Sequence, residues 1–187
     1  MRFGAITAIL SAIVASSGVA QRSWPDAELS RGTLSFDGKS TLGDFTGTTS
    51  TLRGQMAGGA TLAEVRGWVE SPVSTLKTGN DRRDRDLVKT MDAEIFPSIR
   101  FELTGVTPEW ERGDSAGVVL AGNFVIHGVT RAERISATVV RSAEGIRVQA
   151  SGIAMDLHDY KIDKLTRFLV FKMNRDIVVH LDVWFRG

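Results

Sequence analysis

The histidines are the side chains of this sequence best suited to acid–base or metal chemistry, because imidazole titrates near neutral pH and binds many metals. There are three, His127, His158 and His180, and none has a second histidine at metal-ligand spacing. His158, which lies beside Asp156 and Asp159, is the best candidate for a site assembled by folding. The sequence therefore predicts no metal site, with His127 as a hydrogen-bonding turn residue and His180 as a solvent-facing strand residue.

Several motifs of nucleophilic and nucleotide-dependent enzymes are missing. The chain has no cysteine. It also lacks a P-loop, a Gly-x-Gly-x-x-Gly dinucleotide motif and a His-Glu-x-x-His metalloprotease motif. We therefore expect a protein that is not an enzyme, with no catalytic residue and no resident cofactor. The alternative is a hydrolase, and the missing motifs argue against it.

The densest group of charged side chains lies in residues 81–91, where Arg82, Arg83 and Arg85 alternate with aspartates. Arginine binds phosphate through two parallel hydrogen bonds, so this cluster could meet a phosphate on a ligand. The neighbouring aspartates favour a second interpretation, a helix face whose charges neutralise one another. Opposite charges recur four residues apart, as from Arg82 to Asp86, and such pairs support an exposed helix.

Residues 81–91 contain no Gly and no Pro and follow a Thr-Gly-Asn turn, which predicts a short helix. Asn80 or Asp81 can cap it by accepting a hydrogen bond from a free backbone N–H. Leu87 and Met91 are four residues apart and give the helix one apolar edge. Two positions for this helix remain open. It is either an exposed crossover between two strands, which the charge pattern favours, or a lid or plug over one end of a closed sheet.

Most of the remaining chain alternates apolar and polar residues with the period of a β-strand. About eight strand candidates separated by turns predict an antiparallel sandwich or barrel. Most of them have one apolar face, which argues against a parallel sheet buried on both faces. After Ala150 the apolar positions change from even to odd numbers, so Ser151-Gly152 is predicted to be a β-bulge.

Three motifs resemble those of the YceI-like family. They are Thr78-Gly79-Asn80 followed by Arg83-Asp84, Leu87, Phe96-Pro97 and Ile99-x-Phe101; the run Val125-Ile126-His127-Gly128-Val129-Thr130-Arg131; and Leu42-Gly43-x-Phe45-x-Gly47. Together they extend over most of the chain after Leu29. The resemblance implies an all-β fold, an antiparallel eight-stranded lipocalin-like β-barrel with one short helix near residues 81–91. It also implies that the barrel holds a long apolar ligand, often a polyisoprenoid.

The barrel interior is the expected ligand site. The strand pattern alone fits a packed sandwich core equally well, and the resemblance favours the cavity. Small residues on the inner faces, among them Gly67, Gly122, Ala137 and Ala150, leave volume unfilled or mark a close backbone approach. The expected lining residues are Val65, Val69, Ile99, Phe101, Leu103, Leu120, Gly122, Phe124, Ile126, Ile135, Val139, Leu181 and Val183.

Residues 1–20 have the features of a secretory signal peptide. Arg2 supplies the positive start, a short apolar run follows, and Gly18-Val19-Ala20 is a small-x-small cleavage site. The run is shorter than the roughly 20 residues of a membrane span, although an uncleaved anchor is the alternative. We expect a mature domain of residues 21–187 in the periplasm or secreted. The lack of cysteine excludes a lipoprotein anchor and disulfides.

The charge balance bears on the partners. Without Arg2 the basic and acidic residues are equal in number, whereas nucleic-acid-binding proteins usually show a basic excess, so no nucleic acid partner is expected. An outer-membrane barrel would have an apolar exterior, but Arg66, Glu70, Arg100 and Glu102 are predicted to point outward. The expected partner is an apolar small molecule or lipid. The alternative function is a structural or interaction module whose barrel is filled by side chains.

Overall fold

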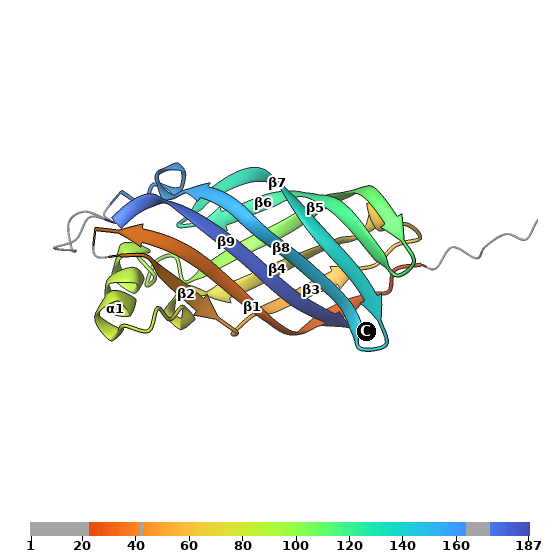
Figure 1. Cartoon of the computed structure of the whole chain (residues 1–187), viewed down its shortest axis with the longest axis horizontal. Coiled ribbons are helices and arrows are strands. Elements are labelled where there is room, and N and C mark those ends of the chain that lie inside the picture. Colours follow the sequence, from red (N-terminus) through yellow and green to blue (C-terminus); the bar gives the residue numbers. More distant parts are fainter. Residues whose placement is uncertain (1–22, 42, 164–172) are drawn as a thin grey trace, which may run out of the picture.

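The computed structural model describes residues 23–41, 43–163 and 173–187, and these form an antiparallel sheet that closes on itself (Figure 1). Its strands are β1 (Ala27–Ser40), β2 (Phe45–Thr49), β3 (Arg53–Ala57), β4 (Arg66–Pro72), β5 (Ser98–Arg112), β6 (Ser115–Ile126), β7 (Val129–Ser142), β8 (Gly145–Asp156) and β9 (Met173–Arg186). Each strand pairs with its neighbours in the order β2-β1-β3-β4-β5-β6-β7-β8-β9, and β1 also pairs with β9. The β1–β9 pairing closes the barrel.

Strands β2 and β3 occupy one position in this barrel. Both pair antiparallel with the same edge of β1, β2 opposite its second half and β3 opposite Ala27 and Glu28. Residues 50–52 interrupt the strand between them. The barrel is therefore eight-stranded, as the sequence predicts, with one interrupted strand.

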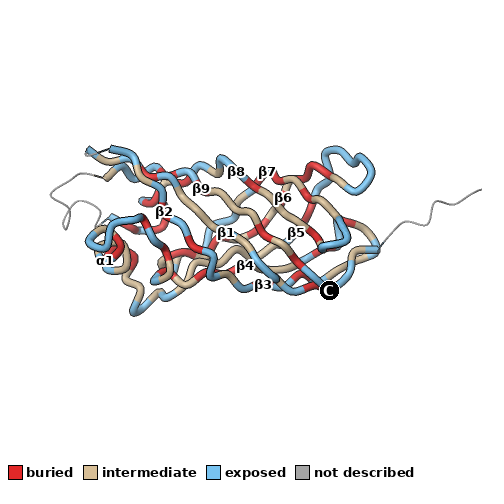
Figure 2. Tube along the Cα trace, turned by 60° about the horizontal axis from the view of Figure 1, so that its bottom comes forward, coloured by how far each residue is buried: buried red, intermediate tan, exposed pale blue. Residues whose placement is uncertain are grey.

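The alternation in the sequence decides which side chains point inward. In β6 the even-numbered residues from Ala116 to Ile126 are buried, and in β9 Ile177, Val179, Val183 and Phe185 are buried. Buried and more exposed positions succeed one another along the strands in Figure 2. The inward side chains form one hydrophobic cluster, and burial of each large one contributes roughly 1.5–3 kcal/mol to folding.

A β-bulge in β8 keeps this alternation in phase with the barrel. The β8–β9 register shifts between Ala150 and Ile153, and Gly152 has a φ of 74°, which suits glycine. Ala150 is buried before the bulge, and Met155 is buried after it. The bulge predicted from the sequence is thus confirmed.

Helix α1 (Asp81–Thr90) lies at one end of the barrel, in the connection from β4 to β5 (Figure 1). The described chain also has three short 3-10 helices: η1 (Leu62–Glu64) between β3 and β4, η2 (Val73–Thr75) between β4 and α1, and η3 (Leu157–Tyr160) after β8. The chain crosses between β3 and β4 through η1, whose Leu62 is buried. No helix in the described part of the chain is both long and apolar enough to cross a membrane.

Candidate functional site

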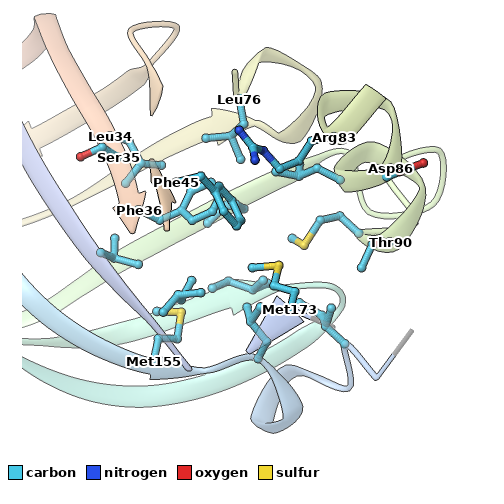
Figure 3. A pocket seen from close by; sticks show the side chains of 18 of the residues that line it. Leu34, Ser35, Phe36, Phe45, Leu76, Arg83, Asp86, Thr90, Met155 and Met173 are labelled. Carbon is cyan, nitrogen blue, oxygen red and sulfur yellow. The ribbon is translucent and has the colours of Figure 1, made fainter. Parts of the chain in front are cut away.

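A cavity of about 230 Å³ lies inside the barrel at the end that carries α1 (Figure 3). Most of its lining is apolar, from strands on opposite sides of the barrel and from the connections at this end. The apolar lining residues are Leu34, Phe36, Phe45, Leu76, Leu87, Met91, Ile99, Phe124, Ile126, Met155, Leu157, Ile162, Met173, Ile177 and Val179. Such a lining excludes water and binds apolar groups without directional contacts.

Most of the polar lining comes from one element, α1. Ser35 and Ser40 come from β1, and the other polar residues belong to α1 or cap it: Asn80, Arg82, Arg83, Asp86 and Thr90. The cavity is therefore amphipathic, with an apolar body inside the barrel and a polar side under the helix.

The start of α1 is fixed by polar contacts that the sequence makes locally. The Asn80 side chain accepts a hydrogen bond from the Arg83 backbone N–H, which is the predicted cap. Asp84 is buried, and its Oδ1 accepts hydrogen bonds from the Thr78 backbone N–H at 2.8 Å and the Thr78 hydroxyl at 2.6 Å. Burial alone would raise the pKa of Asp84, but these bonds and the nearby Lys77 and Arg83 lower it.

Arg83 is held rigidly at the same place. Its Nε donates to Thr78 Oγ1 and its Nη2 to Thr78 O, both at 2.9 Å. The guanidinium lies 4.2 Å above the centre of the Phe45 ring, a cation–π distance. Figure 3 shows this side chain beside Phe45 at the polar side of the cavity. The sequence thus positions a fixed cation at the edge of an apolar space.

His127 contacts two other connections of the chain, the segment after α1 and the one that contains η3. Its Nδ1 lies 3.0 Å from the Tyr160 carbonyl oxygen, and its Nε2 lies 3.2 Å from Asp92 Oδ2. The ring also packs against Phe96 with centroids 4.8 Å apart. His127 has a φ of 51° and begins the β6–β7 turn, so its predicted role as a hydrogen-bonding turn residue is confirmed.

The exposed-crossover interpretation of the helix is wrong, because α1 covers one end of the barrel and supplies part of the cavity wall. Leu87 and Met91, the predicted apolar edge, both line the cavity. Among the described ion pairs there is none between Arg82 and Asp86. The charge pattern favoured an exposed crossover, but the spacing of charges does not show which side of a short helix packs against the barrel.

The structure places the expected lining residues in two groups. Ile99, Phe124 and Ile126 line the cavity. The other ten lie deeper in the barrel and are not part of this cavity wall: Val65, Val69, Phe101, Leu103, Leu120, Gly122, Ile135, Val139, Leu181 and Val183. All of these except Gly122 belong to the hydrophobic cluster or pack against it. These residues therefore pack in the hydrophobic interior, and much of that interior is filled by side chains.

Gly122 shows why the deeper part is filled. We expected it to leave volume unfilled or to mark a close approach, and the second holds. A Cβ at Gly122 would overlap the Phe101 ring and the backbone oxygen of Glu102. Gly67 behaves alike, since a Cβ there would overlap the backbone oxygen of Gln55. The expectation of free space beside Gly122 is therefore wrong, because the Phe101 ring occupies it.

Sequence reasoning missed much of the actual wall. Phe36, Phe45, Met155 and Met173 all line the cavity (Figure 3). Phe45 belongs to a family-like motif and Met155 to the apolar series after the bulge, so both carried a signal. For neither does the sequence give the depth along the barrel axis, which depends on strand register.

The remaining histidines lie on the exterior. His158 Nδ1 is 2.6 Å from Asp163 Oδ1 and His180 Nε2 is 3.1 Å from Asp37 Oδ2, with the His158 side chain largely exposed. Asp156 instead accepts a hydrogen bond from the His158 backbone N–H. Among residues 23–41, 43–163 and 173–187, no group of three or more His, Asp or Glu side chains could hold a metal ion.

One spacing typical of serine hydrolases, Gly113-x-Ser115-x-Gly117, does occur in the chain. The structure places it in the β5–β6 hairpin, with Ser115 as the first residue of β6 and paired with Arg112. A nucleophile elbow requires a sharp turn from a strand into a helix, and here the chain turns from one strand into the next. This spacing therefore does not form a nucleophile elbow.

The exterior has the expected charged character. Glu70 accepts from Arg53 at 2.5 Å and from Arg100 at 3.1 Å, and Arg100 also binds Glu102 at 2.8 Å. Burial alone would raise the pKa of Glu70, but the hydrogen bonds from both arginines lower it. Arg100 also stacks on Trp68 at 4.2 Å. These outward side chains of β3, β4 and β5 form a polar network.

Comparison with known proteins agrees with this architecture. Over 88% of this chain and 99% of the other, the barrel matches a polyisoprenoid binding domain from Saccharophagus degradans, with a TM-score of 0.71 and 16% identity. BcnA of Burkholderia cenocepacia matches over 83% and 96%, with a TM-score of 0.69 and 12% identity. The YceI protein of Campylobacter jejuni matches over 75% and 84%, with a TM-score of 0.58 and 17% identity. At these identities the likeness shows the fold.

No curated protein matches the sequence. The model of the YceI-like domain matches residues 26–185, which is nearly all of the described chain. The closed barrel, its covering helix and this match lead to one conclusion: the chain belongs to the YceI-like domain family.

Proposed function

We propose that this protein binds an isoprenoid or another lipid chain inside its barrel and carries it. The observation that carries the proposal is the cavity under α1, which is apolar in its body and has polar residues on one side. The barrel of the Saccharophagus degradans relative, described as a polyisoprenoid binding domain, supports the same use of the fold.

A module without a ligand is the competing function. The packed part of the barrel is consistent with it, but the cavity is not, because empty apolar volume costs about 24 cal/mol per Å³ in cores. The described wall contains no histidine and no cysteine, the side chains that most often activate or act as nucleophiles. We therefore propose binding rather than catalysis.

Export is part of the proposal. The small-x-small site at Gly18-Val19-Ala20 lies outside the described residues and motivates cleavage after Ala20. N-terminal sequencing of the protein recovered from the periplasm or medium should begin at Gln21. Recovery of a chain that begins at Met1 would instead favour an uncleaved anchor.

Two neighbouring residues of β9 allow a matched test of binding. Val179 is 8% exposed and lines the cavity, whereas Val178 is 36% exposed and does not line it. Val179→Trp should fill the cavity and lower affinity for the neutral apolar fluorophore N-phenyl-1-naphthylamine at least about tenfold, or about 1.4 kcal/mol. Val178→Trp should bind it as the unmodified protein does.

Thermal melts of both variants show whether the barrel persists, since overpacking costs about 1–3 kcal/mol. Native mass spectrometry of the protein from its producing cells, followed by lipid extraction, identifies any lipid carried. A protein that binds neither the fluorophore nor any lipid would support the module without a ligand.

A further inference from the structure

We propose that the ligand is a short amphipathic molecule with an oxygen-bearing head group bound by Arg83. Its apolar part, about two to three isoprene units long, ends at the Phe101–Phe124 pair. This inference rests on the proposed function and narrows its ligand class.

The inner end of the cavity is closed by aromatic packing. Phe124 lines the cavity, and its ring lies 4.8 Å from the ring of Phe101 at an interplanar angle of 53°. Phe101 in turn fills the space above Gly122. Val118, farther along β6, is 0% exposed. A chain that enters from the α1 end therefore meets packed side chains beyond Phe124.

The size of the cavity sets the length of the apolar part. An apolar protein cavity of roughly 150 Å³ holds one benzene ring of six carbons. The volume of about 230 Å³ here therefore corresponds to roughly nine or ten carbons, close to two isoprene units. Met91, Met155 and Met173 line the cavity, and flexible methionines can adjust to about one unit more.

The head group is assigned from the hydrogen bonds that Arg83 leaves unused. The guanidinium has five N–H donors, and the described contacts use Nε and one position on Nη2, both toward Thr78. No described residue accepts a hydrogen bond from its Nη1 and no described carboxylate forms an ion pair with it. Because Thr78 and Phe45 already fix the side chain, little rotamer freedom is lost on binding.

The other charges near the site limit the head group. Arg82 and Asp86 also line the cavity, and Asp86 is three residues from Arg83 on the helix, hence its neighbour. The wall thus has two cations and one carboxylate, and Asp84 beside it also interacts electrostatically with Arg83. This charge balance suits an oxygen acceptor of small or no charge, such as an alcohol or a carboxylate, better than a multiply charged diphosphate. The shared chemistry is one acceptor oxygen on a short apolar chain.

The length limit is tested with linear prenols of about two to eight isoprene units, which displace N-phenyl-1-naphthylamine. Affinity should be highest at two to three units and at least about tenfold lower at eight. Phe101→Leu should move the optimum to longer prenols, because it removes the ring above Gly122. Phe185→Leu is the matched control, since Phe185 is buried outside the cavity wall and the optimum should not move.

The head-group assignment is tested on the same scale. Arg83→Met should lower the affinity for a short prenol or its carboxylic acid at least about tenfold. Its affinity for the fluorophore should stay within about threefold of that of the unmodified protein. Arg85→Met is the control, because Arg85 is an exposed residue of α1 that does not line the cavity. The ratio of alcohol to acid affinity shows which of the two head groups the site prefers.

Each failure has a different signature. If the fluorophore and all prenols fail to bind, the proposed function itself is wrong. Binding that strengthens steadily up to eight units would overturn the length limit while the carrier function stands. Equal loss of prenol and fluorophore in Arg83→Met would mean that Arg83 only holds α1 in place, and the head-group assignment would be withdrawn.

Discussion

At the scale of single residues, Tyr160 carries a buried hydroxyl that has no hydrogen-bond partner among the described residues. Burial raises the pKa of Tyr160 from 10.0 to about 12. Since the folded-state pKa lies above the unfolded one, the unfolded chain releases the proton first as pH rises. The tyrosine therefore lowers the free energy of unfolding progressively between pH 10.0 and about 12.

We expect Tyr160→Phe to be neutral or to stabilise the protein by about 1 kcal/mol at pH 7, because it removes an unpaired buried polar group. It should also remove up to about 2 kcal/mol of the decrease in the free energy of unfolding that the tyrosine causes at alkaline pH. Urea unfolding at neutral and alkaline pH measures both effects. A large loss of stability at neutral pH would show that the hydroxyl has a partner.

Asp84 illustrates the opposite titration. Its folded-state pKa is lowered below 3.8, with burial opposing the shift and the Thr78 hydrogen bonds outweighing burial. The stabilising contribution is therefore complete above pH 3.8 and is lost as pH falls through the lower folded value. Asp84→Asn should cost about 1–3 kcal/mol at pH 7 and much less in strong acid.

Urea unfolding of the parent and Asp84→Asn across acidic pH tests this expectation. Asp81→Asn is a suitable control, because Asp81 is an exposed residue in the first turn of the same helix. A constant difference at every pH would rule out the charge of Asp84 as the source of the stabilisation.

At the scale of elements, the β8 bulge shows how one glycine keeps a strand in phase. Gly152 has a φ of 74° and nothing lies within 4 Å of the position of a Cβ, so its conformation rather than space requires glycine. Gly152→Val should therefore cost about 1–2 kcal/mol from the left-handed backbone alone. Gly152→Asn should cost less, because asparagine adopts this region more readily.

Thermal melts of the two variants and of the parent test the bulge. Gly105→Val in β5 is the control, since nothing lies within 4 Å of a Cβ there and its φ is not in the left-handed region. Equal melting temperatures for Gly152→Val and Gly152→Asn would mean that the strand can take another path past this position.

At the scale of the whole molecule, the barrel has a packed part and a cavity under a helix. All the inward-facing residues of β6 are buried. By contrast, the described backbone pairings of β2 are those with β1 and the bridge between Thr48 and Lys77. Hydrogen exchange should therefore be slowest in the middle of β6 and β7 and fastest in β2 and α1.

A short prenol should slow exchange in α1 and β2, because Leu87 and Phe45 line the cavity, and should leave the slowest amides unchanged. Hydrogen exchange followed by mass spectrometry measures both patterns in one experiment. Uniform protection around the barrel without ligand would contradict the division into two parts.

The sequence alone determined the secondary structure and the inward faces. Alternation predicted the buried series of β6 and β9, the absence of Gly and Pro predicted α1, and the change of parity after Ala150 predicted the bulge. These features are local, because the period of the backbone fixes which side chains share a face. A family-like set of motifs was enough to predict the barrel.

Only the tertiary structure decided where the barrel is open. Periodicity tells whether Phe101 or Phe124 points inward, but not how far along the axis it lies or what it meets there. That depends on register between strands, which sets the Phe101 ring above Gly122, and on the packing of α1, which turns Leu87 toward the interior. A cavity is the small volume left over by many side chains from distant segments, so no local pattern records it.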